Sequence, residues 1–397
     1  MKTVTNTSDV RISNATAIYK LLRKNSVATK SQIAKSINIS FASASNICNQ
    51  LIDKNLLTSE ENIKSTGGRK AARLKFNSSY GDILVIDLHN TYKGQMALLD
   101  MQNNIKEVIN FEIDDNDTLE EILNKIEFGY SKLKEMSKVH IIGVCVGISA
   151  VYVEDTGITI SSSNPVFEGI NIQRHMEELF PSKIVVVEND ANLAALSQLK
   201  SNEVKESFLN IFLTQGVGLG IVLNGELYKG ANGFAGELGH VKVRDINRRC
   251  KCGQVGCIRT VATLESIAID LDELDLLKKS NTPMEYADKL AKRYESGEKK
   301  IIDRVNLTAK KLGVVIAELQ DIFNPQKIIL SGNMSNLFPY INQGARTLSR
   351  DYSKLAKTQD LEISYIDKAP QEIILSGGSE KLLDRWLDEE FPNIING

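Results

Sequence analysis

The sequence has no long apolar run. Its 397 residues contain no stretch that approaches the roughly 18 consecutive apolar residues needed for a membrane-spanning helix. Residues 1–6 are polar and lack the apolar core of a secretory signal peptide. These absences argue against an integral membrane protein and against a secreted one. We therefore expect a cytoplasmic protein with no membrane partner.

Cysteine is also scarce, with five residues in the chain. Cys48 and Cys145 lie far apart in apolar, helical and strand-like settings, so disulfide bonds are not expected in a reducing compartment. Extensive disorder is excluded, because hydrophobic residues make up 42% and charged residues 25% of the chain, as in ordinary globular proteins. The length allows one small domain and one or two larger ones.

The net charge of −2 conceals an uneven distribution. Residues 1–80 contain 13 Lys or Arg and 4 Asp or Glu, a net charge of about +9, so the remainder of the chain is acidic. A basic module joined to an acidic body indicates that the basic part binds a polyanion.

The basic module has the pattern of a helix-turn-helix. Apolar residues recur at helical spacing in residues 14–24, 30–37 and 41–54, with a break at 38–40. Two short strands are expected next, at 56–57 and 72–76, on either side of a polar, glycine-containing loop that would form a wing. We predict a winged helix-turn-helix domain over residues 1–78, with double-stranded operator DNA as its partner.

The residues expected to contact DNA fall into two groups. The outward face of the third helix carries short hydrogen-bonding side chains suited to base edges: Ser43, Ser45, Asn46 and Asn49. The wing carries Arg69 and Lys70, which are suited to phosphates or to a minor groove. The helix has no Arg in its outward set, which favours modest base specificity. A three-helix module for protein interaction is the alternative.

The remainder of the chain contains the same strand–turn–strand pattern twice. A buried strand at 83–87 leads through a turn to a second strand at 96–99, and a strand at 208–213 leads through a turn to one at 221–223. Two similar hairpins suggest a duplicated α/β body with a cleft between two lobes. Further strands are expected at 140–148, 183–187 and 328–333, the last ending in a glycine turn.

A cluster of metal-binding residue types lies between positions 237 and 257. The candidate ligands are His240, Cys250, Cys252 and Cys257. One imidazole and three thiolates can close a tetrahedral site around a soft divalent ion. Four protein ligands leave no position for water, so we predict a structural Zn²⁺ rather than a catalytic one. Buried thiols that never meet a metal are the alternative.

Three motifs, together with the predicted winged helix-turn-helix domain, resemble those of the ROK family of sugar-responsive repressors and sugar kinases. The motifs are residues 188–192 (Glu-Asn-Asp-Ala-Asn), residues 237–240 (Glu-Leu-Gly-His) and the cysteine cluster. The resemblance implies an α/β, actin-like ATPase (ribonuclease H-like) fold with two lobes, a sugar cleft and a zinc site that braces one wall. It also implies a homodimer or a dimer of dimers. We expect a first lobe at 79–190, completed by a C-terminal helix at 380–397, and a second lobe at 191–379 with the zinc site and the dimerisation surface.

The two turns distinguish a repressor from a kinase. The resemblance implies that, in the family's kinases, the residue matching Asp190 is the general base. It also implies that glycine-rich turns hold the phosphates of ATP. Here the first turn reads Asp-Leu-His-Asn-Thr from Asp87, with side chains at both positions that are glycine in kinases, and Thr214-Gln215 departs from the usual second turn. We predict a repressor without enzymatic activity. The alternatives are a ROK-type sugar kinase with an accessory DNA-binding domain and a metal-braced interaction protein without a ligand.

The resemblance also implies a set of effector-binding residues. We expect a hydrogen-bonding cluster for sugar hydroxyls formed by Asn164, Asn189, Asp190, Glu237 and His240. An Asx turn at Asp190 and a helix-terminal carboxylate at Glu237 are the purely structural alternatives. Arg259 stands where sugar-binding members usually carry a glutamate. Either Arg259 donates hydrogen bonds to an anionic or altered ligand, or it turns away from the site.

Overall fold

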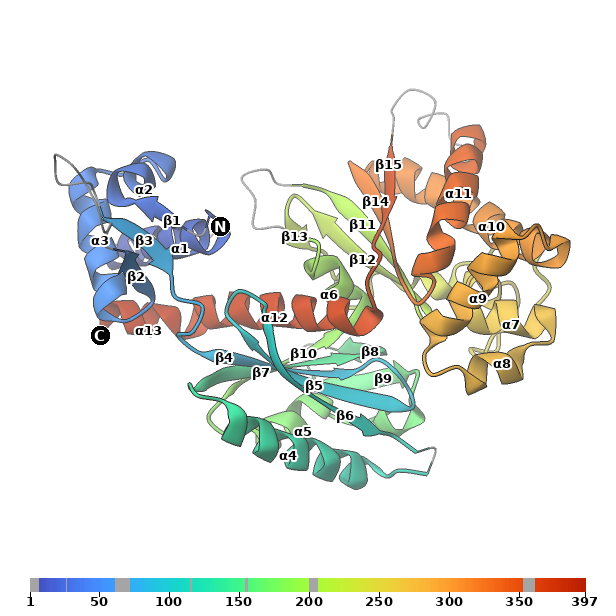
Figure 1. Ribbon diagram of the computed structural model, residues 1–397, viewed down its shortest axis with the longest axis horizontal. Helices are drawn as coiled ribbons and strands as arrows, with labels where there is room; N and C mark the ends of the chain where they lie inside the picture. Colours follow the sequence, from blue (N-terminus) through green and yellow to red (C-terminus); the bar gives the residue numbers. More distant parts are fainter. Residues whose placement is uncertain are drawn as a thin grey trace.

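The protein consists of a small head and a larger body that contains two five-stranded sheets (Figure 1). The structure is a computed structural model, and it describes residues 7–25, 27–60, 72–114, 116–153, 156–199, 206–352 and 361–397. No helix in these ranges is both long and apolar enough to cross a membrane.

Within its described residues, the head contains three helices and a three-stranded antiparallel sheet of order β1-β3-β2. Its elements are α1 (Thr7–Asn25), β1 (Val27–Thr29), α2 (Lys30–Ser36), α3 (Phe41–Asp53), β2 (Leu57–Glu60) and β3 (Arg73–Phe76). A capping box between Thr29 and Gln32 begins α2, and the side chain of Ser40 caps α3. The three helices lie where periodicity predicts them, although α1 begins seven residues earlier than expected. Strand β1 was not predicted.

The first sheet of the body has the strand order β10-β7-β4-β5-β6. Its strands are β4 (Asp82–Leu88), β5 (Lys93–Asp100), β6 (Ile105–Glu112), β7 (Ile141–Ile148) and β10 (Ile184–Asn189). Strands β4, β7 and β10 run parallel, and β4 and β7 are buried throughout, which explains their continuous apolar sequences. Helices α4 (Leu119–Met136) and α5 (Ile172–Leu179) cover one face (Figure 1). A hairpin of β8 (Ala150–Val153) and β9 (Ile158–Ser162) extends from β7, followed by the short helix η1 (Pro165–Phe167).

The second sheet has the order β13-β12-β11-β14-β15. Its strands are β11 (Phe208–Leu213), β12 (Val217–Leu223), β13 (Glu226–Leu227), β14 (Lys327–Gly332) and β15 (Glu362–Tyr365). Five helices accompany it: α7 (Leu264–Leu271), α8 (Leu274–Lys279), α9 (Pro283–Glu295), α10 (Lys299–Phe323) and α11 (Phe338–Tyr352). Three short 3₁₀ helices lie in its connections: η2 (Leu238–His240), η3 (Ile258–Thr260) and η4 (Ser335–Leu337). As predicted, the body contains two similar antiparallel hairpins, β4–β5 and β11–β12. In both sheets the first strand of the hairpin also pairs with a parallel strand.

Helix α6 (Asp190–Leu196) lies between the two sheets. It packs against β11 and β12 of the second sheet and against α12 (Pro370–Glu389), which covers β4, β7 and β10. Side chains at Gly220 of β12 or at Gly377 of α12 would overlap the backbone of α6, so glycine is required for this close approach. Helix α6 is therefore in direct contact with elements of both halves of the body.

The C-terminal helices join the body to the head. Helix α12 begins at Pro370, ten residues before the expected start, and Figure 1 shows it running to the head, where α13 (Phe391–Asn396) meets α1. Tyr19 of α1 is fully buried, with its ring centroid 5.9 Å from that of Trp386 and 5.3 Å from that of Phe391. The core of the head is thus continuous with that of the first sheet.

Candidate functional site

The parallel strands β4, β7 and β10 end at the same edge of the first sheet, with β7 between the other two, and the ends of β4 and β10 carry polar residues. Asn189 caps α6, with its Oδ1 accepting the backbone N–H of Ala191 at 2.9 Å. The Asp190 carboxylate accepts the same N–H at 2.8 Å. Asp190 is therefore fixed at a helix N-terminus, where the helix dipole favours negative charge.

A buried histidine fills the turn after β4. Nδ1 of His89 lies 2.7 and 2.9 Å from the two carboxylate oxygens of Asp87, and both side chains are buried. Burial lowers the pKa of His89, but the carboxylates of Asp87 and Asp190 outweigh burial and leave it raised. Burial raises the pKa of Asp190 to about 6, against the opposing effect of His89. We call Asp87, His89 and Asp190 the first polar cluster.

The turn between β11 and β12 is bonded directly to the turn after β4. Oγ1 of Thr91 donates to Oε1 of Gln215 at 2.7 Å, and the carbonyl of Gln215 accepts Nη2 of Arg259 at 3.1 Å. Asn164 caps η1 through its Oδ1 and donates to the Thr91 carbonyl at 3.5 Å. The two turns are thus bridged by side chains of the protein itself.

On the second-sheet side, Glu237 and His240 lie at the two ends of η2. The preceding Gly236 has a φ of 99° and lies against the backbone of Leu219, so only glycine fits there. Burial raises the pKa of Glu237, and the guanidinium of Arg259 opposes that shift. We call Glu237, His240 and Arg259 the second polar cluster.

A small cavity joins the two sides. Its lining residues come from β8, β10, α6 and the loop before η2: Ala150, Val151, Tyr152, Glu188, Asn189, Asn192, Lys229, Gly233, Ala235 and Glu237. Buried Glu188 forms ion pairs with Lys229 at 2.6 Å and with Lys381 of α12 at 3.5 Å. Burial raises the pKa of Glu188, but the two lysines outweigh burial and leave it lowered. The cavity therefore offers both charged and neutral hydrogen-bonding groups.

The four predicted metal ligands meet. The candidate ligand atoms of His240, Cys250, Cys252 and Cys257 all lie within 4.8 Å of one another. The Sγ atoms of Cys252 and Cys257 are 3.7 Å apart, and Nδ1 of His240 is 4.0 Å from Sγ of Cys250. A tetrahedron with Zn–S bonds of about 2.3 Å requires sulfur atoms about 3.8 Å apart. The donor types and their separations thus fit a four-coordinate metal.

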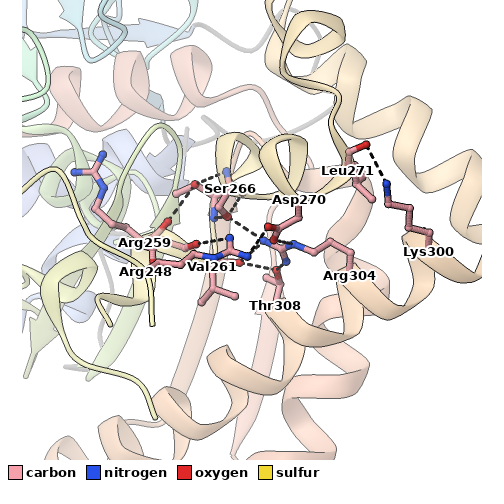
Figure 2. A network of polar contacts seen from close by, with 11 residues as sticks. Arg248, Arg259, Val261, Ser266, Asp270, Leu271, Lys300, Arg304 and Thr308 are labelled. Carbon is pink, nitrogen blue, oxygen red and sulfur yellow. Dashed lines mark hydrogen bonds and ion pairs between the residues drawn. The ribbon is translucent and has the colours of Figure 1, made fainter. Parts of the chain in front are cut away.

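An ion-pair network anchors the loop that carries these cysteines (Figure 2). Arg248 and the buried Arg304 of α10 both form ion pairs with Asp270 of α7. Arg304 also donates to the Val261 carbonyl at 3.0 Å, just beyond η3. Figure 2 shows the Arg259 side chain pointing away from this network. Helices α7 and α10 therefore hold the loop that carries the candidate metal ligands. Arg259 instead contacts the turn at Gln215.

The predicted effector residues occupy different places. Asn189 and Glu237 line the cavity. Asp190 belongs to the first polar cluster, and Asn164 contacts the Thr91 turn rather than the cavity lining. Sequence reasoning missed Glu188, although it belongs to the quoted motif, and also Lys229, for which the sequence carries no signal.

The predicted DNA-contacting residues of α3 lie at or near the surface. Ser43, Asn46 and Asn49 are exposed, and Ser45 is half-buried. Nζ of Lys30 lies 3.3 Å from Oγ of Ser45 and 2.5 Å from Oδ1 of Asn49. The predicted wing residues Arg69 and Lys70 lie outside the described residues.

Comparison with known proteins extends these observations. The model of the ROK family matches residues 85–372. A relative named "Xylose repressor" from Caldicellulosiruptor bescii is 24% identical over 381 residues, covering 91% of this chain and 93% of the relative.

Two solved structures share the fold. A ROK family transcriptional regulator, described as a homolog of the Escherichia coli MLC protein, has a TM-score of 0.78 and 21% identity, covering 98% of this chain and 100% of its own. A ROK hexokinase from Thermus thermophilus has a TM-score of 0.62 and 20% identity, covering 77% of this chain and 99% of its own. This chain thus shares the actin-like, two-lobed α/β fold with both of these proteins.

Proposed function

The chain belongs to the ROK family, and from that premise we propose that it is a transcriptional repressor controlled by a small carbohydrate or sugar derivative. The observation that carries this proposal is the head, where α3 follows α2 at helix-turn-helix spacing and exposes Ser43, Asn46 and Asn49. Such a helix enters the major groove with its N-terminal residues on base edges. The relative named as a xylose repressor, which spans both head and body, supports this function.

We propose that residues 1–78 act as a winged helix-turn-helix on double-stranded operator DNA. The net charge of about +9 over residues 1–80 supports binding to phosphates, with Arg69 and Lys70 at the wing. A homodimer or dimer of dimers would place two heads on half-sites about 34 Å apart. The body would then divide into lobes at 79–190, with the C-terminal helix, and at 191–379, with the dimerisation surface.

We propose that the effector occupies the cavity between β10 and η2. Asn189 of β10 and Glu237 at the start of η2 both line it, and their hydrogen-bonding groups suit the hydroxyl groups of a carbohydrate. Asp190, His240 and Asn164 would complete or support the site. Arg259 would narrow it beside Glu237 or donate to an anionic group of the ligand.

A structural Zn²⁺ would be held by His240, Cys250, Cys252 and Cys257. It would supply four bonds that close the loop between η2 and η3. The loop in turn positions Glu237, which lies three residues before His240. The ion's role is thus to hold the second polar cluster in place.

Helix α12 would carry the signal from cavity to head. At Lys381 it contacts Glu188 of the cavity, and at Glu380 it forms a bidentate pair with Arg23 of α1 at 2.7 Å for both bonds. Adjacent residues of one helix therefore contact the effector site and the DNA-binding head. A ligand that moves Glu188 or Lys229 changes the contacts that hold α12 and, through it, the head.

A sugar kinase with an accessory head is disfavoured by the first turn. The His89 side chain is buried in an ion pair where the kinases have a glycine-rich turn for phosphate. By resemblance, Asp190 matches the general base of the family's kinases, but positioning and charge stabilisation of the phosphoryl group dominate this chemistry.

The test uses the full chain and fluorescent DNA from upstream of its own gene. We expect selective binding with a Kd of about 10⁻⁸ M or tighter, which weakens steeply with salt and changes with one member of a panel of neutral, phosphorylated and acidic sugars. Absence of selective DNA binding would overturn the proposal. ADP release that requires both a sugar and Asp190 would favour the kinase instead.

A further inference from the structure

A large apolar side chain stands at the start of the helix expected to read DNA. Phe41 is the first residue of α3, and 60% of it is exposed to solvent. Its neighbours Ala42 and Ser43 are also exposed, whereas the apolar residues of the core face, such as Ile47 and Leu51, are buried. Phe41 therefore contributes little to the packing of the head, and its exposure calls for another role.

Three of the four polar side chains predicted to face DNA, those of Ser43, Ser45 and Asn49, already form hydrogen bonds within the head. Oγ of Ser43 lies 2.9 Å from Oγ of Ser40 in the helix cap. Lys30 binds Ser45 and Asn49. To accept a hydrogen bond from a base, the oxygens of Ser45 and Asn49 must share or give up the bond that each accepts from Lys30 in the free protein. Burying the exposed ring of Phe41 against DNA breaks no hydrogen bond. Removal of this apolar surface from water is favourable.

We propose that Phe41 reads the C5 methyl group of a thymine in each half-site. This inference rests on the proposed repressor function and identifies a specificity-determining residue for it. The thymine methyl is the apolar group that base edges offer in the major groove, and phenylalanine is among the side chains that contact it. The N-terminal residues of a recognition helix are also those that approach base edges.

The experiment removes the methyl group and the ring separately. The full chain and its variants bind synthetic duplexes of the selected operator in which each thymine is replaced in turn by deoxyuridine. We expect the wild type to lose about threefold to fivefold in affinity at one thymine per half-site, the equivalent of one buried methyl group. Phe41→Ala should bind the thymine duplex more weakly and should show a thymine-to-uracil ratio of about one at that position.

Phe128→Ala is the matched control, because Phe128 of α4 is 63% exposed and belongs to the body. It should retain the wild-type affinities and the wild-type response to deoxyuridine.

Three results would overturn the inference. A Phe41→Ala protein with the wild-type thymine-to-uracil ratio would show that Phe41 does not contact the methyl group. Weaker binding by Phe41→Ala with no sensitive thymine in the wild type would assign the ring to another contact, such as a protein surface or a wedge between bases. A full chain without selective DNA binding would overturn the repressor function itself, and this inference with it.

Discussion

The two polar clusters of the body are built in different ways. Asp87, His89 and Asp190 of the first are buried at the end of a strand and the start of a helix. Glu237, His240 and Arg259 of the second lie in or beside two 3₁₀ turns and keep contact with solvent. Regular elements and burial order the first cluster, whereas the second depends on loop contacts.

The difference indicates where each cluster takes its stability from. The first cluster is held by the hydrogen bonds of the first sheet and of α6, together with its own ion pair. The second is held by the candidate metal ligands and by the Arg248–Asp270–Arg304 network. Loss of the metal should therefore disorder the second cluster and leave the first intact.

The largest expected effect comes from Cys252→Ala. Zinc content should fall from about one per chain to near zero, and the effector response should disappear. The cost should be on the order of 5 kcal/mol, a fraction of the roughly 10–16 kcal/mol by which zinc stabilises small zinc domains. Metal analysis and thermal unfolding measure both effects.

The control and the comparison use other parts of the chain. Cys48→Ala, which alters a buried thiol of the head, should retain the zinc. Trp386 is the single tryptophan and packs against Tyr19 and Tyr80, so its fluorescence reports on the interface between head and body. A Trp386 signal that changes when the metal is removed would show that the disorder extends to the interface between head and body, and would contradict an effect confined to the second cluster.

The second prediction tests the first cluster alone. His89→Ala leaves Asp87 buried without its partner, which should lower the free energy of unfolding by about 3 kcal/mol. Zinc content should not change, and no ATP turnover should appear, because Asn90 and Gln215 still depart from the kinase turns. His175→Ala, near the surface of α5, should stay within about 0.5 kcal/mol of wild type. Urea unfolding followed by circular dichroism gives the comparison, and loss of zinc in His89→Ala would contradict it.

The third prediction concerns pH and Asp190. Its pKa is about 6 in the folded protein and about 3.9 in an unfolded chain, so the folded state binds more protons between these values. The stability that Asp190 contributes is therefore fully present below pH 4 and is lost as pH rises to 6. A pKa difference of about two units between the folded and unfolded states corresponds to at most about 3 kcal/mol in the free energy of unfolding.

Asp190→Asn cannot titrate, so its free energy of unfolding relative to wild type should rise by up to about 3 kcal/mol between pH 4 and 7. Chemical denaturation at several pH values measures this difference. A difference that does not vary with pH would mean that the carboxyl is ionised throughout the range in the folded protein.

Sequence reasoning predicted the parts of the site that depend on local pattern. Periodicity indicated the helices of the head, and the spacing of histidine and cysteine indicated the metal cluster. Contacts between distant segments were missed, because local sequence patterns do not reveal which charged side chains the topology brings together. Lys229 and Lys381 on Glu188 are the main example. The proposed role of Phe41 was not predicted, because an apolar residue at a helix start is usually assigned to the core.

The smallest expected effect belongs to the bond between the two turns. Thr91→Val deletes the hydroxyl that Gln215 accepts at 2.7 Å while keeping the side-chain volume. A neutral, half-buried hydrogen bond contributes about 1 kcal/mol, so we expect a loss of that size or less in the free energy of unfolding. Thr347→Val, which removes a hydroxyl bonded to its own helix, is the matched control and should change stability less.

Because the carbonyl of Gln215 also accepts a hydrogen bond from Arg259 of the second cluster, Thr91→Val should shift the effector concentration for half-maximal response by a few-fold. Calorimetry with the effector found in the sugar panel measures the shift, and an affinity that equals that of wild type would show that the two clusters bind the ligand without communicating through the turns.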